Sequence, residues 1–314
     1  MERFHHAEAN YDIEESDVFL SGHHACPGCG EALAVRYVIN TMGPRTIAIV
    51  PPSCIAIIAG LQPNSSMRVP IVHGTLESSA ASAAGVRRAL NHQRKHDVNV
   101  LVMAGDGGTY DIGFQALSGA AERNEDMVYV CLDNEGYMNT GAQKSGSTPH
   151  LASTASTPGG KTTGKKNIAE IMAAHRIPYV ATATIGYPDD LARKVAKARD
   201  LKGMRFIVVL TPCLDGWGLP ENGAVRVSRL AVETGFFPLF EVEDGVRYTI
   251  NHGPRGMPVQ RYLEAQKRFR HLEAEQKERL QAEVDEAWAL LRARVECGAL
   301  PAATGDSGDG FPGR

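Results

Sequence analysis

The sequence lacks an excess of positive charge: 33 Lys and Arg stand against 36 Asp and Glu, for a formal net charge of −3. Proteins that bind nucleic acid usually carry a strongly basic surface, so this balance argues against a nucleic-acid partner. No apolar run approaches the roughly 18 residues that a membrane-spanning helix needs. We therefore expect no nucleic-acid partner and no membrane partner.

The sequence also lacks internal repeats at solenoid or propeller periods. Residues 1–19 are charged and have no apolar core of the kind that a secretion signal carries, so we expect a cytoplasmic location. The six cysteines indicate ligands or free thiols rather than a disulfide framework. Hydrophobic residues make up 43% and charged residues 22%, which is the balance of a folded protein rather than a disordered one.

Five short apolar runs rich in β-branched residues predict buried strands, and helical patterns separate them. Strands that alternate with helices predict an α/β fold with a doubly wound, mostly parallel sheet. The predicted strands are 46–50, 98–104, 127–132, 179–184 and 205–210, and the predicted helices are 30–41, 78–92, 113–123, 167–174 and 188–199.

Composition divides the chain into four expected parts. An N-terminal arm at 1–20 precedes an α/β domain at 21–240, a helical C-terminal extension at 241–303 and a loose tail at 304–314. Within the extension, 258–295 is highly charged and helix-rich, which is typical of a solvated peripheral helix or one that packs between subunits.

Four of the cysteines lie where parallel sheets place their sites. Cys26 and Cys29 form a C-x-x-C motif in a Gly- and Pro-rich loop, whereas Cys54 and Cys213 each follow a predicted strand after one or two prolines. Four thiolates on converging loops suit either a [4Fe–4S] cluster or a structural zinc ion. A redox dithiol of the first two alone is a third alternative. Cys131, inside an apolar strand, is expected to be buried and inert.

A second motif joins the ends of two neighbouring strands. The Asp106 carboxylate, the Asn134 amide oxygen and a carbonyl near Gly136 can hold Mg²⁺ together with a diphosphate. Glycines let the backbone approach phosphates, and the helix expected from Gly113 points its N-terminus toward them. The alternative is a plain strand-to-helix turn. The residues of this predicted site are Gly105, Asp106, Gly107, Gly108, Asn134 and Gly136.

The segment 139–166 is rich in Gly, Ser, Thr and Lys and predicts a long loop of the kind that is usually functional or mobile. Part of it, 159–166, is close to a P-loop, but Lys166 stands where Ser or Thr would bind magnesium, so we reject an NTPase. The loop lysines are expected to be solvated, and attraction of an anionic substrate is the alternative. These lysines are Lys144, Lys161, Lys165 and Lys166.

Together these motifs resemble the β subunits of 2-oxoacid:ferredoxin oxidoreductases. The Gly-Asp-Gly at 105–107 with Asn134 resembles the thiamine diphosphate motif, and Gly22–Gly30 (GHHACPGCG) is similar to the opening of that subunit. The resemblance runs from about residue 20 to about residue 220 and includes 116–123, 133–141 and 177–181.

The resemblance implies a fold of the diphosphate-binding type and a set of cofactors. It implies thiamine diphosphate with Mg²⁺ on Asp106, Asn134 and the Gly136 carbonyl. It places Asn139 and Thr140 near the thiazolium ring and the substrate, as catalytic residues. It also favours the [4Fe–4S] cluster over zinc, with the ligands Cys26, Cys29, Cys54 and Cys213.

The resemblance further implies a reaction and partners. Members of the family decarboxylate a 2-oxoacid and pass electrons singly through the cluster to ferredoxin, and in the pyruvate enzymes coenzyme A takes the acyl group. The Glu that bonds the thiamine aminopyrimidine lies on another subunit. We therefore expect this chain to be inactive alone and to work with a pyrimidine-binding α-type subunit and a ferredoxin-like or γ/δ-type subunit.

The substrate expectation rests on two departures from the pyruvate pattern, Met67–His73 and Leu76–Ala80. They favour oxalate oxidoreductase, which splits oxalate into two CO₂ without coenzyme A. Pyruvate or another 2-oxoacid with coenzyme A is the alternative. From other classes, a zinc-stabilised non-catalytic scaffold subunit and a thiamine lyase or synthase remain. The pattern assigns no role to His23, His24, His73 and Glu77.

Overall fold

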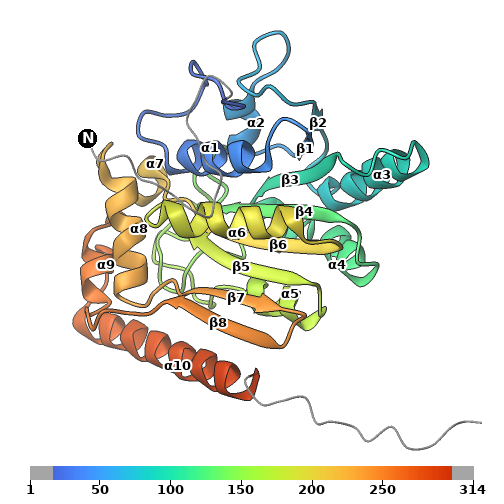
Figure 1. The fold of residues 1–314 in the computed structure, drawn as a ribbon. Coiled ribbons are helices and arrows are strands. Elements are labelled where there is room, and N and C mark those ends of the chain that lie inside the picture. The colour runs from blue at the N-terminus through green and yellow to red at the C-terminus, as the bar shows by residue number, and fades with distance from the viewer. Residues whose placement is uncertain (1–16, 299–314) are drawn as a thin grey trace, which may run out of the picture.

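The computed structural model describes residues 17–298, which form an eight-stranded sheet with helices on both faces (Figure 1). The strand order is β2-β1-β3-β4-β6-β5-β7-β8. The first six strands in this order are parallel, and the last two are antiparallel to their neighbours. The strands are β1 (Thr46–Val50), β2 (Ile71–His73), β3 (Asn99–Gly105), β4 (Met127–Asp133), β5 (Tyr179–Thr184), β6 (Met204–Leu210), β7 (Leu239–Glu243) and β8 (Arg247–His252).

Two hydrophobic cores lie on the two faces of this sheet. One face packs against α1 (Gly30–Met42), α2 (Cys54–Ala59) and α6 (Pro188–Asp200). The other face packs against the remaining elements, and α10 runs beside β8 at one end of the sheet (Figure 1). These are α3 (Ser79–His92), α4 (Phe114–Glu122), α5 (Ile168–Ala174), α7 (Leu214–Trp217), α8 (Gly223–Glu233), α9 (Gln260–Glu264), η2 (Lys267–Phe269) and α10 (Ala274–Gly298).

Strand β3 shows why these runs become central strands. Val100 and Val102 belong to one core, while Leu101 and Met103 belong to the other, because successive side chains of a strand point to opposite faces. A strand covered on both faces has to be apolar throughout. The five predicted strands are confirmed to within one residue, and so is the doubly wound, mostly parallel α/β fold.

The expectation of a wholly helical extension from residue 241 is wrong. The chain from Leu239 to His252 forms the hairpin β7–β8, so the expected boundary at 240 lies inside a strand. This hairpin occupies the edge of the sheet, where β8 is half exposed and its apolar residues form no continuous run. The helical part begins at Gln260. Residues 1–16 and 299–314, with most of the expected arm and the whole tail, lie outside the described residues.

The topology places the cysteine and glycine motifs side by side. From β1 the chain goes outward to β2, then returns to β3 on the other side of β1. In open parallel sheets, ligands bind at such a switch point, beyond the carboxyl ends of the strands. Cys54 follows β1 and Asp106 follows β3 at this point. Among the described residues, no helix is long and apolar enough to cross a membrane.

Candidate functional site

A cavity of about 260 Å³ lies at this switch point, and all six residues of the predicted diphosphate site line it, so it is called the diphosphate cavity below. Strands β3 and β4 are paired with Gly105 opposite Leu132, so the residues that follow them emerge together. Ser53 and Cys54 reach the same cavity from the end of β1. Its lining is Pro52, Ser53, Cys54, Leu76, Gly105, Asp106, Gly107, Gly108, Asn134, Gly136, Tyr137, Met138, Asn139 and Thr140.

The glycines after β3 make room for neighbouring side chains as well as for a ligand. A Cβ on Gly107 would collide with the ring of Tyr137, and one on Gly108 would lie 3.2 Å from Leu76. The helix expected from Gly113 is present as α4 (Phe114–Glu122) with Gly113 at its N-cap, but its N-terminus does not line the cavity as expected. A π-helical turn, η1 (Gly107–Asp111), follows β3 directly, so its first residues, rather than the start of α4, border the cavity.

Of the Asp106 and Asn134 side chains, the first has a hydrogen-bond partner for its carboxylate, but the second has an amide oxygen without one. The Asp106 carboxylate is 1% exposed and accepts a hydrogen bond from the Ser145 hydroxyl. Burial and the nearby Asp133 raise the pKa of Asp106. Oδ1 of Asn134 is buried and has no hydrogen-bond partner. A buried acceptor without a donor is costly, and a cation satisfies both oxygens at once.

Behind Asn134 lies Glu31, a residue that the sequence analysis missed. Its Oε2 accepts a hydrogen bond from Nδ2 of Asn134 (3.1 Å), which leaves Oδ1 of the amide free. Oε1 of Glu31 is buried without a partner, and burial raises the pKa of this carboxyl to about 7. Glu31 directly follows the C-x-x-C-G motif, and that adjacency is the sequence signal that could have pointed to it.

Asn139 and Thr140, the predicted catalytic residues, are exposed and line the same cavity. The Thr140 hydroxyl donates to Oε1 of Gln143 (2.6 Å). Tyr137, which lies between the glycine turn and these residues, donates its hydroxyl hydrogen to Asp111 (2.8 Å). The structure therefore brings both predicted catalytic residues to the outer side of the site.

The four predicted cysteine ligands lie near one another, and Cys54 is the one that lines this cavity. Cys29 caps α1, Cys54 begins α2, and Cys213 caps α7 with its sulfur accepting from the Gly216 amide (3.4 Å). Burial and the neighbouring Glu31, followed by the other three cysteines, raise the pKa of the Cys54 thiol. Burial raises the pKa of the Cys29 thiol to about 11. The spare thiols lie elsewhere, with Cys131 buried in β4 and Cys297 exposed near the end of α10.

The loop lysines are not all solvated, which corrects the expectation for three of them. The Lys161 Nζ donates to the Thr148 carbonyl (2.7 Å), and Lys166 donates to the Tyr110 carbonyl. The Lys165 ammonium lies 2.8 Å from both Asp133 and Glu135. The Lys165 and Lys166 contacts tie the loop 139–166 to the segments that follow β4 and β3, while the Lys161 bond lies within the loop. Lys144 alone of the four is exposed.

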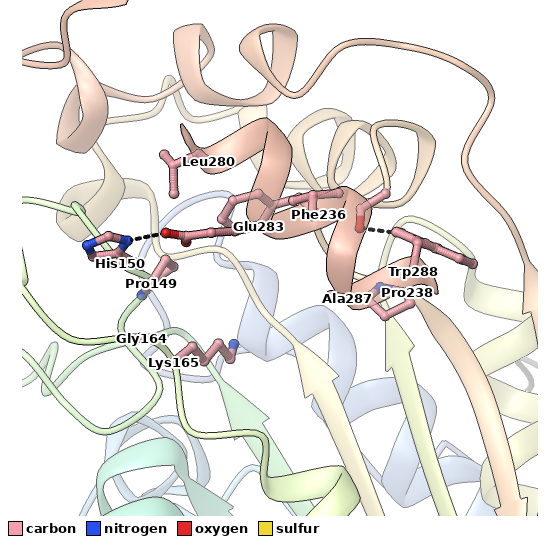
Figure 2. A pocket seen from close by; sticks show the side chains of 12 residues that line it. Pro149, His150, Gly164, Lys165, Phe236, Pro238, Leu280, Glu283, Ala287 and Trp288 are labelled. Carbon is pink, nitrogen blue, oxygen red and sulfur yellow. Dashed lines mark hydrogen bonds and ion pairs between the residues drawn. The ribbon is translucent and has the colours of Figure 1, made fainter. Parts of the chain in front are cut away.

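A further cavity of about 300 Å³ lies between this loop and α10 (Figure 2). His150 of the loop points toward Glu283 of the helix, with Nδ1 and Oε1 2.8 Å apart (Figure 2). Its other lining is mostly apolar, and Trp288 donates to the Gly235 carbonyl (2.7 Å). His150, Glu283 and Trp288 thus have partners within the chain, whereas Oδ1 of Asn134 in the diphosphate cavity has none.

The residues left without a role in the sequence lie outside the diphosphate cavity. His23 stacks on Phe19 with ring centroids 5.0 Å apart. Glu77 is exposed and accepts a hydrogen bond from Thr75 (2.8 Å).

Comparison with known proteins gives a consistent result. Residues 54–209 match the family described as thiamine pyrophosphate enzyme, C-terminal TPP binding domain. The chain is 47% identical over 286 residues to pyruvate synthase subunit PorB of Methanothermobacter thermautotrophicus, covering 89% of this chain and 99% of PorB. It is 43% identical over 291 residues to ketoisovalerate oxidoreductase subunit VorB of Pyrococcus horikoshii, covering 88% of this chain and 93% of VorB.

A solved structure supports the fold. The 2-oxoglutarate:ferredoxin oxidoreductase from Magnetococcus marinus superposes with a TM-score of 0.55 at 24% sequence identity, over 65% of this chain and 69% of that one. At this identity the similarity concerns the fold alone.

Proposed function

The chain belongs to the family of 2-oxoacid oxidoreductase β subunits with a thiamine pyrophosphate-binding domain, and from that premise we propose its role in detail. It is the thiamine diphosphate-, Mg²⁺- and [4Fe–4S]-binding subunit of a pyruvate:ferredoxin oxidoreductase. It works with a pyrimidine-binding α-type subunit and a ferredoxin-like or γ/δ-type subunit, and ferredoxin accepts the electrons. The observation that carries the proposal is one cavity that joins Asp106, the unpartnered Asn134 oxygen and Cys54.

The donor set fits magnesium. Asp106 offers a carboxylate and Asn134 an amide oxygen without a partner, and both line the cavity with Gly136. Hard Mg²⁺ prefers such oxygens and completes its octahedron with phosphate oxygens and water. Gly107 and Gly108 line the same cavity, where the diphosphate would lie.

The cysteine set fits a cluster better than zinc. Cys29, Cys54 and Cys213 stand at the starts of three helices, and Cys26 precedes Cys29 by three residues. The other three thiols help to raise the pKa of the Cys54 thiol, and Cys54 itself lines the cavity. Within 17–298, no three His, Cys, Asp or Glu side chains converge closely enough to hold a single ion. A [4Fe–4S] cluster is bound by four thiolates at separate irons, so its ligands stand further apart than those of one tetrahedral zinc.

Bound in this cavity, thiamine diphosphate would supply the carbanion chemistry of decarboxylation, and a cluster held by Cys26, Cys29, Cys54 and Cys213 would supply one-electron transfer. The residues of this chain would hold and orient these groups. Asp106 and Asn134 would hold Mg²⁺ for the diphosphate, while Ser145 and Glu31 hold those two side chains through hydrogen bonds. Asn139 and Thr140, on the exposed side, contact the substrate.

Pyruvate with coenzyme A is the proposed substrate pair, and a branched 2-oxoacid is the second candidate. The pyruvate synthase and ketoisovalerate oxidoreductase names of the relatives support this choice. No finding supports the oxalate expectation. The departures at 67–73 and 76–80 on which it rested include the edge strand β2, and Leu76 of the second stretch lines the cavity.

The test is anaerobic purification of the chain with its partner subunits, followed by viologen reduction with pyruvate, ketoisovalerate, 2-oxoglutarate or oxalate, with and without coenzyme A. Pyruvate-driven reduction that requires coenzyme A is the expected result. Reduction by oxalate without coenzyme A would restore the oxalate reading. A preparation that contains zinc, lacks iron and oxidises none of these acids would instead support the alternative of a zinc-stabilised, non-catalytic scaffold subunit.

Substitution of Cys54 by Ser separates the two cofactors. The variant should lose viologen reduction and part of its iron while still binding thiamine diphosphate with Mg²⁺, because it loses one thiolate and no oxygen ligand. Iron content and calorimetric thiamine diphosphate binding check this, with Cys297→Ser, an exposed thiol far along the chain, as the matched control. Electron transfer at the wild-type rate in Cys54→Ser would contradict the cluster.

A further inference from the structure

Two residues from the last third of the chain contact the loop that follows β4. The Trp217 indole donates a hydrogen bond from Nε1 to the carbonyl oxygen of Asn134 (2.8 Å). Nη2 of Arg268 lies 2.6 Å from Oε2 of Glu135. Both side chains are buried, and neither lines the diphosphate cavity. The loop that carries the proposed magnesium ligands is therefore held from outside the cavity.

Arg268 and Trp217 also contact each other. The guanidinium carbon lies 3.6 Å from the centre of the Trp217 ring, which is a close cation–π stack. Trp217 ends α7, the short helix that Cys213 caps. One stacked pair thus joins the segment of a proposed cluster ligand to the loop of the proposed magnesium ligands.

The loop needs this support because Glu135 has a left-handed backbone, with φ +64°. A residue other than glycine adopts this conformation at a cost of about 1 kcal/mol or more and keeps it only where the surroundings enforce it. Glu135 stands between Asn134 and Gly136, so its φ sets the direction of both proposed ligands. Asn134 is thereby tied to the Trp217 ring on one side and to the Glu135 pairing on the other.

The Glu135 carboxylate is fixed by two cations. Oε1 lies 2.8 Å from Lys165 and Oε2 lies 2.6 Å from Arg268. Burial alone would raise the pKa of Glu135, but these two cations outweigh it and lower that pKa, so the carboxylate stays charged. Arg268 is held in turn by Gln266, whose Oε1 accepts from Nε (2.8 Å).

We propose that Arg268 is a positioning residue, which holds Asn134–Gly136 in the magnesium-binding conformation and keeps the Cys213 segment in register with it. Arg268 acts through Glu135 and Trp217 and touches neither cofactor. The inference rests on the proposed function, because it takes Mg²⁺ and the cluster to lie at these segments.

The test measures metal binding in the assembled, anaerobically purified complex, without turnover. The complex is stripped of metal and thiamine diphosphate, then titrated with Mn²⁺ in the presence of thiamine diphosphate, and free Mn²⁺ is counted by its electron paramagnetic resonance signal. Arg268→Gln should raise the Mn²⁺ dissociation constant about tenfold, the usual scale for a residue that orients metal ligands. The spectrum of the dithionite-reduced cluster should shift in the same variant.

Two further variants separate positioning from general stability. Arg268→Lys keeps the charge opposite Glu135 but loses the planar stack, so it should recover most of the Mn²⁺ affinity and leave the cluster spectrum shifted. Arg270→Gln, an exposed arginine two residues on, should change neither. Wild-type Mn²⁺ affinity in folded Arg268→Gln would overturn the proposal.

If the Arg268→Gln complex does not assemble, Glu135→Gln is the second variant. It removes the other member of the Arg268–Glu135 ion pair and should weaken Mn²⁺ binding to a similar degree. Unchanged affinity in that variant would also overturn the proposal. A wild-type complex that binds no Mn²⁺ with thiamine diphosphate would instead overturn the proposed function, and this inference with it.

Discussion

Two clusters of buried charged side chains in this molecule have a similar composition but different roles. The site cluster lies at the carboxyl ends of β3 and β4, and the α6 cluster joins α6 to the sheet at β5 and β7. The site cluster consists of Asp106, Asp133, Glu135, Lys165 and Arg268. The α6 cluster consists of Asp190, Arg193, Lys194 and Glu241.

The two clusters differ in the buried oxygens near them that lack a hydrogen-bond partner. In the α6 cluster, Lys194 donates to Asp190 (2.6 Å) and to the Thr182 carbonyl (2.8 Å), and no buried atom of its four members lacks a partner. Unpaired buried oxygens lie beside both clusters. Beside the α6 cluster it is Oδ1 of Asn251, whose amide donates to Glu241, and beside the site cluster these are Oε1 of Glu31 and Oδ1 of Asn134. Of these three residues, Asn134 alone lines the diphosphate cavity. Neither buried charge nor an unpaired acceptor alone therefore marks a functional site, whereas an unpaired acceptor in the lining of a cavity does.

The largest effect should follow Asp106→Asn. Loss of a carboxylate ligand should weaken Mg²⁺ with thiamine diphosphate by roughly a hundredfold or more and abolish viologen reduction by the complex. The thermal midpoint of the metal-free chain should not fall, because the fold raises the pKa of Asp106 and so disfavours its charge. If the variant retained wild-type metal affinity, Asp106 would not be a metal ligand, and the two clusters would no longer differ in function.

Asp190→Asn is the matched substitution in the α6 cluster. It leaves Lys194 buried without its carboxylate, which should lower the free energy of unfolding by about 3 kcal/mol. The loss is limited because burial already lowers the pKa of Lys194 to about 8, so the amine can shed its proton. Urea unfolding measures the loss. Mn²⁺ affinity should not change, and a tenfold change there would show that the two clusters are coupled.

Glu31 should give the metal-free chain a pH dependence. Its pKa is raised from 4.5 to about 7 in the fold, so the folded chain binds more protons than the unfolded chain between these values. The contribution of Glu31 to stability is therefore fully present below pH 4.5 and is lost as the pH rises through 7, by up to about 3 kcal/mol. Glu31→Gln should flatten this slope in urea unfolding at pH 5 and pH 7.5. An equal slope in variant and wild type would contradict the assignment.

The smallest effect should follow Asp97→Asn, which breaks the exposed ion pair with Arg45. Both side chains are largely exposed, at 64% and 65%. Exposed pairs contribute about 0–1 kcal/mol, so the unfolding midpoint should barely move. A loss as large as that of Asp190→Asn would mean that burial does not decide what a charge pair contributes here.

Sequence could predict what depends on neighbours along the chain. The five central strands are continuous apolar runs, and the Gly-Asp-Gly turn with Asn134 follows two of them directly. It could not predict β2, which has three residues, or the hairpin β7–β8, whose edge position leaves half of it polar and exposed. Those elements depend on partners across the sheet.

The site divides in the same way. The cavity gathers the predicted glycines with Asp106 and Asn134 because they end adjacent parallel strands. Glu31 reaches Asn134 across 103 residues, and Arg268 reaches Glu135 across 133. No local pattern marks such contacts, and the charged composition around Arg268 instead indicated a solvated helix.

The position of Arg268 along the chain bears on how the protein is made. Synthesis runs from the N-terminus, so the cysteines at 26, 29 and 54 leave the ribosome long before this arginine does. The nascent chain therefore carries its thiols while the loop after β4 still lacks its support. If Arg268 positions that loop as proposed, we expect full metal binding only once the chain is almost complete, after the thiols made earlier have already been accessible to oxidants.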